Sequence, residues 1–138
     1  MRLEEVIGRP FLTRQEKAVI AAAVADAEQR TSVRMHVYVK AHTGGEDFLA
    51  RAKQRFGLLG LHRAGGGRNV MVLVSALDQR FAVWGGEELH NQAGQELWDR
   101  ARDILAEHLA AGHAAEGIVS CVRFIGDEFA RHFPRDTR

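Results

Sequence analysis

The feature that most constrains the fold is an unbroken apolar run from Val70 to Val74. The run is rich in β-branched side chains and is too short for an ordinary helix. Because no position in it is polar, it is typical of a central strand that is covered on both faces. The sequence therefore predicts a sheet with this segment inside it.

Two neighbouring segments supply further strands. Apolar and polar residues alternate over residues 33–39, which predicts a half-buried strand. Arg80 to Trp84 predicts a third strand, which follows a turn at Ala76 to Gln79. We expect the second and third strands to form a hairpin.

Helical patterns surround these strands. Thr13 and Glu16 have the spacing of a capping box, which predicts a helix that continues to Arg30. Its expected inward face consists of Val19, Ile20, Ala23, Val24 and Ala27. Further helices are predicted at about Glu46–Arg55, Ala93–Ala110 and Ala114–His132. Trp98 and His108 lie on the apolar stripe of the long helix, Trp98 as a core residue and His108 at its boundary.

The order of these elements predicts the topology. Strand, helix and strand in succession favour a parallel first pair joined by a right-handed crossover, and the hairpin adds the third strand antiparallel. A chain of 138 residues fits one domain. The predicted fold class is α/β: a small mixed β-sheet flanked by helices as an α/β/α sandwich, in a single domain over residues 1–138.

Composition excludes some functions. Lys and Arg number 19 against 18 Asp and Glu, so the basic surplus of a typical nucleic-acid binder is missing. The single cysteine, Cys121, has no partner for an internal disulfide. Glu4 and Glu5 stand where a signal peptide needs a basic and then apolar segment, and no apolar run is long enough to span a membrane. We therefore expect a cytoplasmic protein that is not embedded in a membrane.

Few residues suggest a site. Asp78 in the hairpin turn is either an acidic ligand or nucleophile, or a favoured turn residue, and the turn role is favoured. Glu87 and Glu88 follow Gly85-Gly86 and are candidate cation ligands, although one strand of about 20 Å separates them from Asp78. Trp84 is a candidate interaction anchor, or a packing residue between the third strand and the long helix.

Several short motifs follow one another along the chain: Leu12-Thr13 with Glu28 to Ser32, Met35-His36-Val37, Arg68 to Val74, Asp78 to Gly85, Leu89 to Trp98, and Phe133-Pro134. In this order they resemble the TPM-domain family. The resemblance covers a core of about residues 12–134 and points to the short, soluble, single-domain bacterial branch. It implies an α/β sandwich. Relatives include thylakoid proteins linked to photosystem II repair, for which acid phosphatase activity is proposed, and membrane-anchored bacterial proteins often encoded beside LemA-type proteins. Acidic loops of some members are thought to bind divalent cations.

Three acidic positions of that pattern are changed here. Arg34 and Arg68 stand at two positions where the pattern has an acidic residue, and each carries a positive charge instead. Gly86 stands at the third such position. We therefore expect a non-catalytic binding or adaptor domain whose partner is an unknown protein, for example a membrane-associated relative or a LemA-type protein. The alternative is a divalent-cation-binding domain, or a cation-dependent acid phosphatase, that uses Asp78 or the pair Glu87 and Glu88 with Mg²⁺ or Ca²⁺. No other cofactor is indicated.

Overall fold

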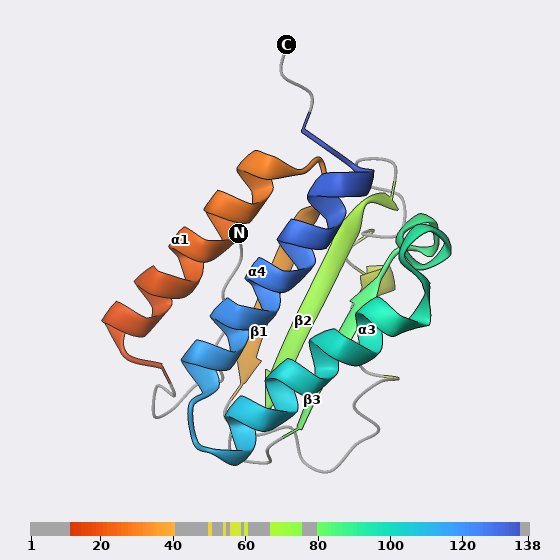
Figure 1. Cartoon of the computed structure of the whole chain (residues 1–138). Coiled ribbons are helices and arrows are strands. Elements are labelled where there is room, and N and C mark those ends of the chain that lie inside the picture. The colour runs from red at the N-terminus through yellow and green to blue at the C-terminus, as the bar shows by residue number, and fades with distance from the viewer. Residues whose placement is uncertain are drawn as a thin grey trace.

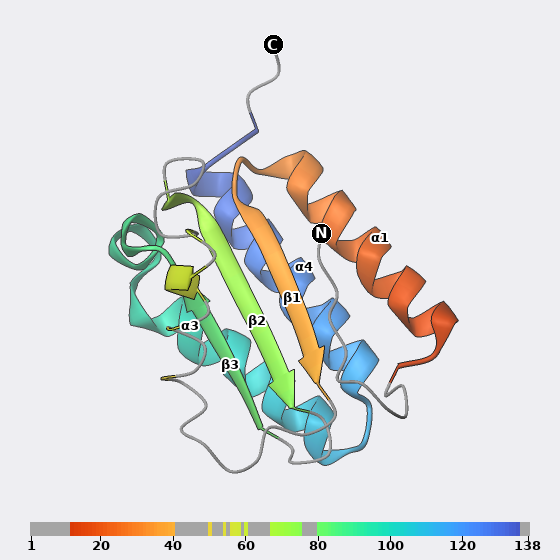
Figure 2. The ribbon, with the colours of Figure 1, turned by 180° about the vertical axis from the view of Figure 1, so that it is seen from behind.

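The computed structural model describes residues 12–40, 50, 54, 56–58, 60, 67–75 and 80–135. Its labelled elements are α1 (Arg14–Arg30), β1 (Arg34–Lys40), β2 (Asn69–Ser75), β3 (Arg80–Gly85), α3 (Glu87–Ala110) and α4 (Ala114–His132). These three helices lie side by side over one face of the sheet (Figure 1), and the view from behind presents the other face (Figure 2).

The sheet has the predicted topology. Its strand order is β1-β2-β3, with β1 and β2 parallel and β2 and β3 antiparallel. All seven residues of β2 are buried, which confirms the central strand predicted from the run Val70 to Val74. The register brings the starts of β1 and β2 and the finish of β3 to one end of the sheet, since Arg34 pairs with Asn69 and Val70 pairs with Gly85.

The helical layer forms because each helix has one apolar face. In α1, the hydroxyl of Thr13 accepts from the backbone amide of Glu16 and the Glu16 carboxylate accepts from the Thr13 amide, so the predicted capping box is confirmed. The middle helix, α4, contacts both α1 and α3. Its fully buried side chains recur at helical spacing: Ile118, Cys121, Val122, Ile125 and Phe129. They pack into one core with the inward-facing residues of the strands.

A smaller cluster covers the opposite face of the sheet. It consists of Tyr38, Phe56, Met71, Leu73 and Ala82, with Trp84 packed against it. Phe56 is one of the described helical residues 54 and 56–58, and it is 3% exposed. The expected helix at Glu46–Arg55 lies almost wholly outside the described residues. Both faces of the sheet thus contribute to an apolar core, and the α/β single-domain class is confirmed.

Two expectations about the helices are wrong. Val19 is 47% exposed, whereas Ile20 is fully buried. Successive residues of a helix differ by about 100° in direction, and the stripe through Ile20, Val24 and Ala27 leaves Val19 at its edge. Val19 instead lines a surface hollow of about 460 Å³ between α1 and α4.

The long helix also begins earlier than the expected Ala93. α3 starts at Glu87, but Gly94 interrupts it with φ 73° and ψ 172°. A residue with positive φ breaks the helical path, and glycine adopts that conformation without steric cost. The apolar period used to predict this helix belongs to the part after Gly94, and the short part before it was missed.

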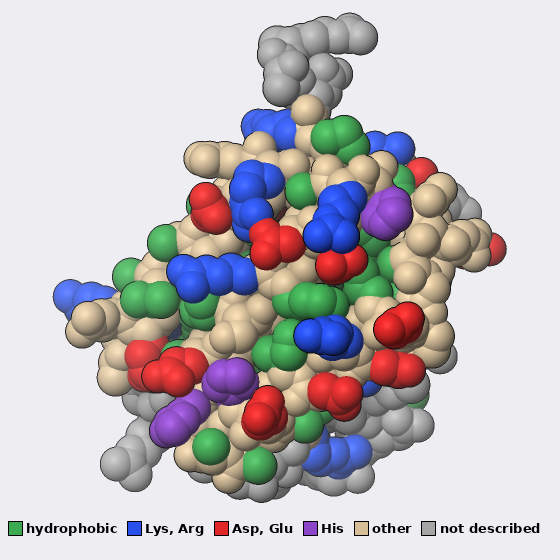
Figure 3. Space-filling model, viewed as in Figure 1, with side chains coloured by type: hydrophobic (Ala, Val, Ile, Leu, Met, Phe, Trp, Pro, Cys, Tyr) green, Lys and Arg blue, Asp and Glu red, His purple; other side chains and the backbone are tan. Residues whose placement is uncertain are grey.

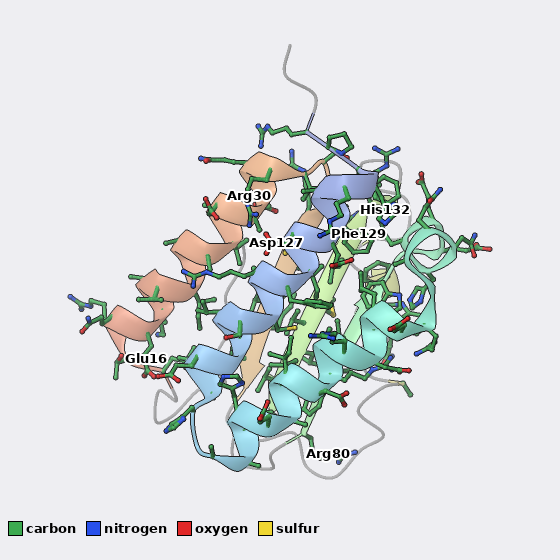
Figure 4. All side chains as sticks on the ribbon, viewed as in Figure 1. Glu16, Arg30, Arg80, Asp127, Phe129 and His132 are labelled. Atoms are coloured by element: carbon green, nitrogen blue, oxygen red, sulfur yellow. The ribbon has the colours of Figure 1, made fainter. Side chains whose placement is uncertain are left out.

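The outer surface of the helical layer is polar and mixed in charge. Figure 3 shows Lys and Arg side chains interspersed with Asp and Glu on this face. Figure 4 shows Arg30 of α1 and Asp127 of α4 pointing toward one another, and they form an ion pair. Among the described residues, no helix combines the length and apolar character needed to cross a membrane.

Candidate functional site

One end of the sheet brings together the three positions that depart from the family pattern. β1 and β2 begin at this end and β3 finishes there. The Arg34 amide donates to the carbonyl of Arg68 (2.9 Å), and the Gly86 amide donates to the carbonyl of Asn69 (3.2 Å). We call this region, with Arg34, Arg68 and Gly86, the Arg68 end. Residues far apart in sequence therefore share one site because of the strand register.

Arg68 is held by three neighbours. Its Nη1 donates to the hydroxyl of Ser32 (3.0 Å), and its Nη2 lies 3.4 Å from Oε1 of Glu88. The guanidinium also lies over the ring of Phe133, with 4.6 Å between its carbon and the ring centroid. The Arg68 and Glu88 side chains are 37% and 44% exposed, so solvent weakens the ion pair. These contacts place a fixed positive charge at the end of the sheet.

Gly86 leaves no room for a side chain. The carbonyl group of Gly67 occupies the place that a Cβ on Gly86 would take. Gly67 itself has φ 79°, a conformation that favours glycine. An aspartate at position 86, which the family resemblance led us to expect, would require the backbone at Gly67 to move.

The other face of the Arg68 end carries a second polar pair. His36 donates through Nε2 to Oδ1 of Asn69 (3.0 Å), and Asn69 is only 2% exposed. His36 is half-buried, and it is one of the polar positions in the alternation over residues 33–39 that predicted β1. The pair satisfies a buried amide and joins the third residue of β1 to the first residue of β2.

A groove adjoins the Arg68 end where β3 passes into α3. We call it the Trp84 groove. Its lining residues are Phe56, Gly57, Trp84, Gly85, Gly86, Glu87 and His90, and its volume is about 430 Å³. That volume lies in the range of ligand-binding clefts. Glu87 is the acidic residue of the lining, and the remainder is mostly aromatic side chain and glycine backbone.

A series of aromatic ring contacts runs from the groove into the core. The ring of His90 lies between Trp84 (5.1 Å between centroids) and Trp98 (4.5 Å). Trp98 contacts Phe129 at 6.0 Å, and Phe129 contacts Phe133 at 5.8 Å. Trp98 is fully buried, as predicted, and its ring packs so close to Gly85 that a Cβ there would meet it at 2.6 Å. The series of rings connects the groove wall to the residue on which Arg68 stacks.

The predicted site residues have different outcomes. Asp78 lies outside the described residues, so its role stays a prediction. Glu87 and Glu88 are both exposed, with Glu87 in the groove and Glu88 paired to Arg68. Trp84 is half-buried; it contacts His90 of α3 and also lines the groove, so its surface role stays open. Within the part of the chain that the structure describes, no group of three or more His, Cys, Asp or Glu side chains is arranged to hold a metal ion.

Sequence reasoning missed Phe56, His90 and Phe133 as parts of this region. Phe56 and Phe133 reach it through tertiary packing, which no local pattern encodes. His90 precedes the Gly94 kink, in the short helical part that the apolar period did not reveal. The local signals that pointed here were Trp84, the Gly85-Gly86 pair followed by two acids, and the changed positions Arg34 and Arg68.

Two other candidates have structural roles. His108 is half-buried and donates through Nδ1 to the carbonyl of Ile104 (2.8 Å), which agrees with a boundary residue. Cys121 is buried in the core, and burial raises the pKa of its thiol to about 12. A thiol with such a pKa stays protonated at neutral pH and is a poor nucleophile.

Comparisons with known proteins identify the family. The family model of the TPM domain matches residues 9–128 of this chain. The BA42 protein of the psychrophilic bacterium Bizionia argentinensis, solved by NMR, is similar at 26% identity, with a TM-score of 0.87 over 94% of this chain and 88% of that chain.

Two further solved structures share the fold. They are the N-terminal domain of the cg2496 protein of Corynebacterium glutamicum (16% identity, TM-score 0.74, 92% of this chain and 78% of that chain) and the N-terminal domain of a protein from P. gingivalis (14%, 0.74, 99% and 87%). A comparison with curated proteins found no match. With most of its length matched by the family model, the chain belongs to the TPM-domain family.

Proposed function

We propose that this chain is a non-catalytic binding domain that recognises a protein partner. The observation that carries the proposal is the position of Arg68 at the end of the sheet, where it contacts Ser32, Glu88 and Phe133. A hard cation such as Mg²⁺ or Ca²⁺ needs several oxygen ligands and is repelled by a fixed guanidinium. The charge at this end therefore opposes the site that a cation-dependent phosphatase requires.

The acids near this end support the same proposal. Glu88 has the Arg68 guanidinium as its neighbour, which competes with any cation for the carboxylate. Gly86 has no space for the third acid of the family pattern, because the Gly67 carbonyl lies there. Glu87 remains as a single carboxylate of the groove, and one carboxylate is a weak ligand set for a hard cation.

The Trp84 groove supplies a surface suited to a protein. Tryptophan is enriched at the energetic centres of protein interfaces because its large ring buries much area with few rotatable bonds. The partner proposed on the family resemblance is a membrane-associated relative or a LemA-type protein. In this proposal the partner contacts Trp84 and the adjoining Glu87.

A turnover assay tests the proposal against the phosphatase alternative. The protein is incubated with p-nitrophenyl phosphate, with and without Mg²⁺ or Ca²⁺, from acidic to neutral pH. We expect no release above the buffer rate. A kcat that Asp78→Ala or Glu87→Ala abolishes would establish the phosphatase and overturn the proposal.

A retention assay tests the binding role. Immobilised wild-type protein, Trp84→Ala and Val19→Ala are exposed to lysate from the native host. Val19 is a matched control because it is an exposed apolar residue on the helical face, away from the groove. We expect a partner that the wild type and Val19→Ala retain and Trp84→Ala loses; equal retention by all three would place the contact elsewhere.

A further inference from the structure

We propose that the Trp84 groove holds an arginine side chain of the partner, between the indole ring of Trp84 and the carboxylate of Glu87. The inference rests on the proposed binding function and names the chemistry that the groove recognises. Both side chains line the same hollow, with Glu87 exposed at its rim and Trp84 half-buried in its wall.

The Trp84 ring is anchored and only partly covered. On the sheet it packs against the cluster that contains Met71 and Phe56, and on the helix side it contacts the His90 ring at 5.1 Å. Those contacts fix the indole without burying it fully. Tryptophan attracts cations over its ring face more strongly than the other aromatic side chains do.

The charge of the groove favours a cationic ligand. Among the described residues that line the groove, Glu87 supplies the carboxylate and none is lysine or arginine. The neighbouring acid, Glu88, is already paired with Arg68. Phe56, Trp84, His90 and glycine backbone form the rest of the described lining, so the Glu87 carboxylate lies beside an aromatic surface that a cationic side chain can also contact.

The shape of the groove favours a peptide over a small free cation. A volume of about 430 Å³ exceeds that of one side chain. Leu58, directly after Gly57 of the groove, is 81% exposed and offers an apolar surface beside it. A peptide with leucine next to arginine can cover both, and the planar guanidinium can stack on the indole while it donates to the carboxylate.

The experiment is an NMR titration of the full-length, ¹⁵N-labelled chain. The probe is a capped pentapeptide of sequence Gly-Leu-Arg-Leu-Gly, used up to about 10 mM because a single anchored side chain gives millimolar affinity. Matched peptides carry citrulline, which keeps the shape but not the charge, or glutamate in place of arginine. We expect the arginine peptide to shift the Trp84 indole and the amides of Glu87 and His90, with both control peptides at least fivefold weaker.

Three variants locate the contact. Glu87→Gln should weaken the arginine peptide about three- to fivefold, as expected for a partly exposed charge pair, and should leave the citrulline peptide unchanged. Trp84→Leu should weaken it more than tenfold. Glu107→Gln, an exposed acid elsewhere on α3, should have no effect. Because Glu87→Gln changes only an exposed side chain, it keeps the test valid if Trp84→Leu is poorly folded.

The outcomes separate this inference from the proposed function. Equal shifts from the arginine and citrulline peptides would overturn the arginine site and leave a partner-binding groove. Shifts from no peptide, or shifts away from Trp84 and Glu87, would also overturn it. Turnover of a phosphomonoester would instead overturn the proposed function, and it is measured independently.

Discussion

Arg68 stacks its guanidinium on the ring of Phe133, with 4.6 Å between the guanidinium carbon and the ring centroid. The contact joins the residue before β2 to the residue that follows α4. Beside it, the Ser32 amide donates to the Phe133 carbonyl (2.9 Å), so the end of α4 is also tied to the start of β1. The Arg68 guanidinium therefore lies at the end of the sheet where the family resemblance led us to expect acids.

Removal of the Arg68 charge should destabilise the fold slightly. Arg68→Gln loses the cation–π contact with Phe133 and the ion pair with Glu88, and we expect a loss of about 1 kcal/mol in the free energy of unfolding. Urea denaturation measures it. Arg102→Gln is the control, because Arg102 pairs only locally with Asp99 on α3 and should change stability by less than about 0.5 kcal/mol. Equal effects of the two substitutions would contradict the role assigned to Arg68.

A side chain at position 86 should be costly. Gly86→Ala puts a Cβ where the Gly67 carbonyl lies, so the backbone must shift, and we expect a loss of about 1–3 kcal/mol. Gly57→Ala is the matched control, because its Cβ would meet nothing within 4 Å, and it should stay within about 0.5 kcal/mol of the wild type. Thermal unfolding of both variants measures the change in stability. A Gly86→Ala variant as stable as the wild type would show that the aspartate expected from the family resemblance is sterically permitted here.

The elements that the sequence predicted well are those with strong local signals. The apolar run at Val70 to Val74, the alternation over residues 33–39 and the capping box of Thr13 each correspond to an observed element. Their period or end signal is a direct consequence of helix and strand geometry. The failures, Val19 and the start of α3, arose where a helical face has an edge or where Gly94 breaks the period.

The site was less predictable than the fold. The sequence showed that Arg34, Arg68 and Gly86 stand where the resemblance leads us to expect acids. That these three residues lie close together in space depends on the register of three strands. The contact of Arg68 with Phe133 joins residues separated by most of the second half of the chain. Such contacts arise from tertiary packing, and no local pattern carries them.

The exposure of Val19 leads to a stability contrast with its neighbour. Val19→Lys should change the free energy of unfolding by less than about 0.5 kcal/mol, because the side chain is 47% exposed. Ile20→Ala should cost about 2–5 kcal/mol, because the fully buried side chain leaves a cavity in the core. Chemical denaturation of the two variants measures the contrast. A large loss in Val19→Lys would mean that the face of α1 is assigned wrongly.

The buried thiol predicts a pH dependence in the alkaline range. Burial raises the pKa of Cys121 from 9.0 to about 12. Between these values the unfolded chain releases the proton and the folded chain keeps it, so stability is unaffected below about pH 9 and falls as pH rises toward 12. The slope contributed by this group is about 1.4 kcal/mol per pH unit.

The comparison with Cys121→Ala isolates that contribution, because other groups titrate in the same range in both proteins. We expect the wild type to lose stability more steeply than the variant above pH 9. A thiol reagent at pH 8 should label the folded wild type only at the rate of unfolding. Rapid labelling of the folded protein, or parallel pH profiles, would contradict the burial of this thiol.

A titration of metal-free, ¹⁵N-labelled protein with Mg²⁺ and Ca²⁺ tests the central claim most directly. The claim is that the Arg68 end does not bind a metal cation and that the chain acts by binding a protein. The account predicts no saturable shift of the Glu87 and Glu88 amides at low millimolar ion. Localised, saturating shifts at these two residues would contradict it and would restore the cation-dependent alternative.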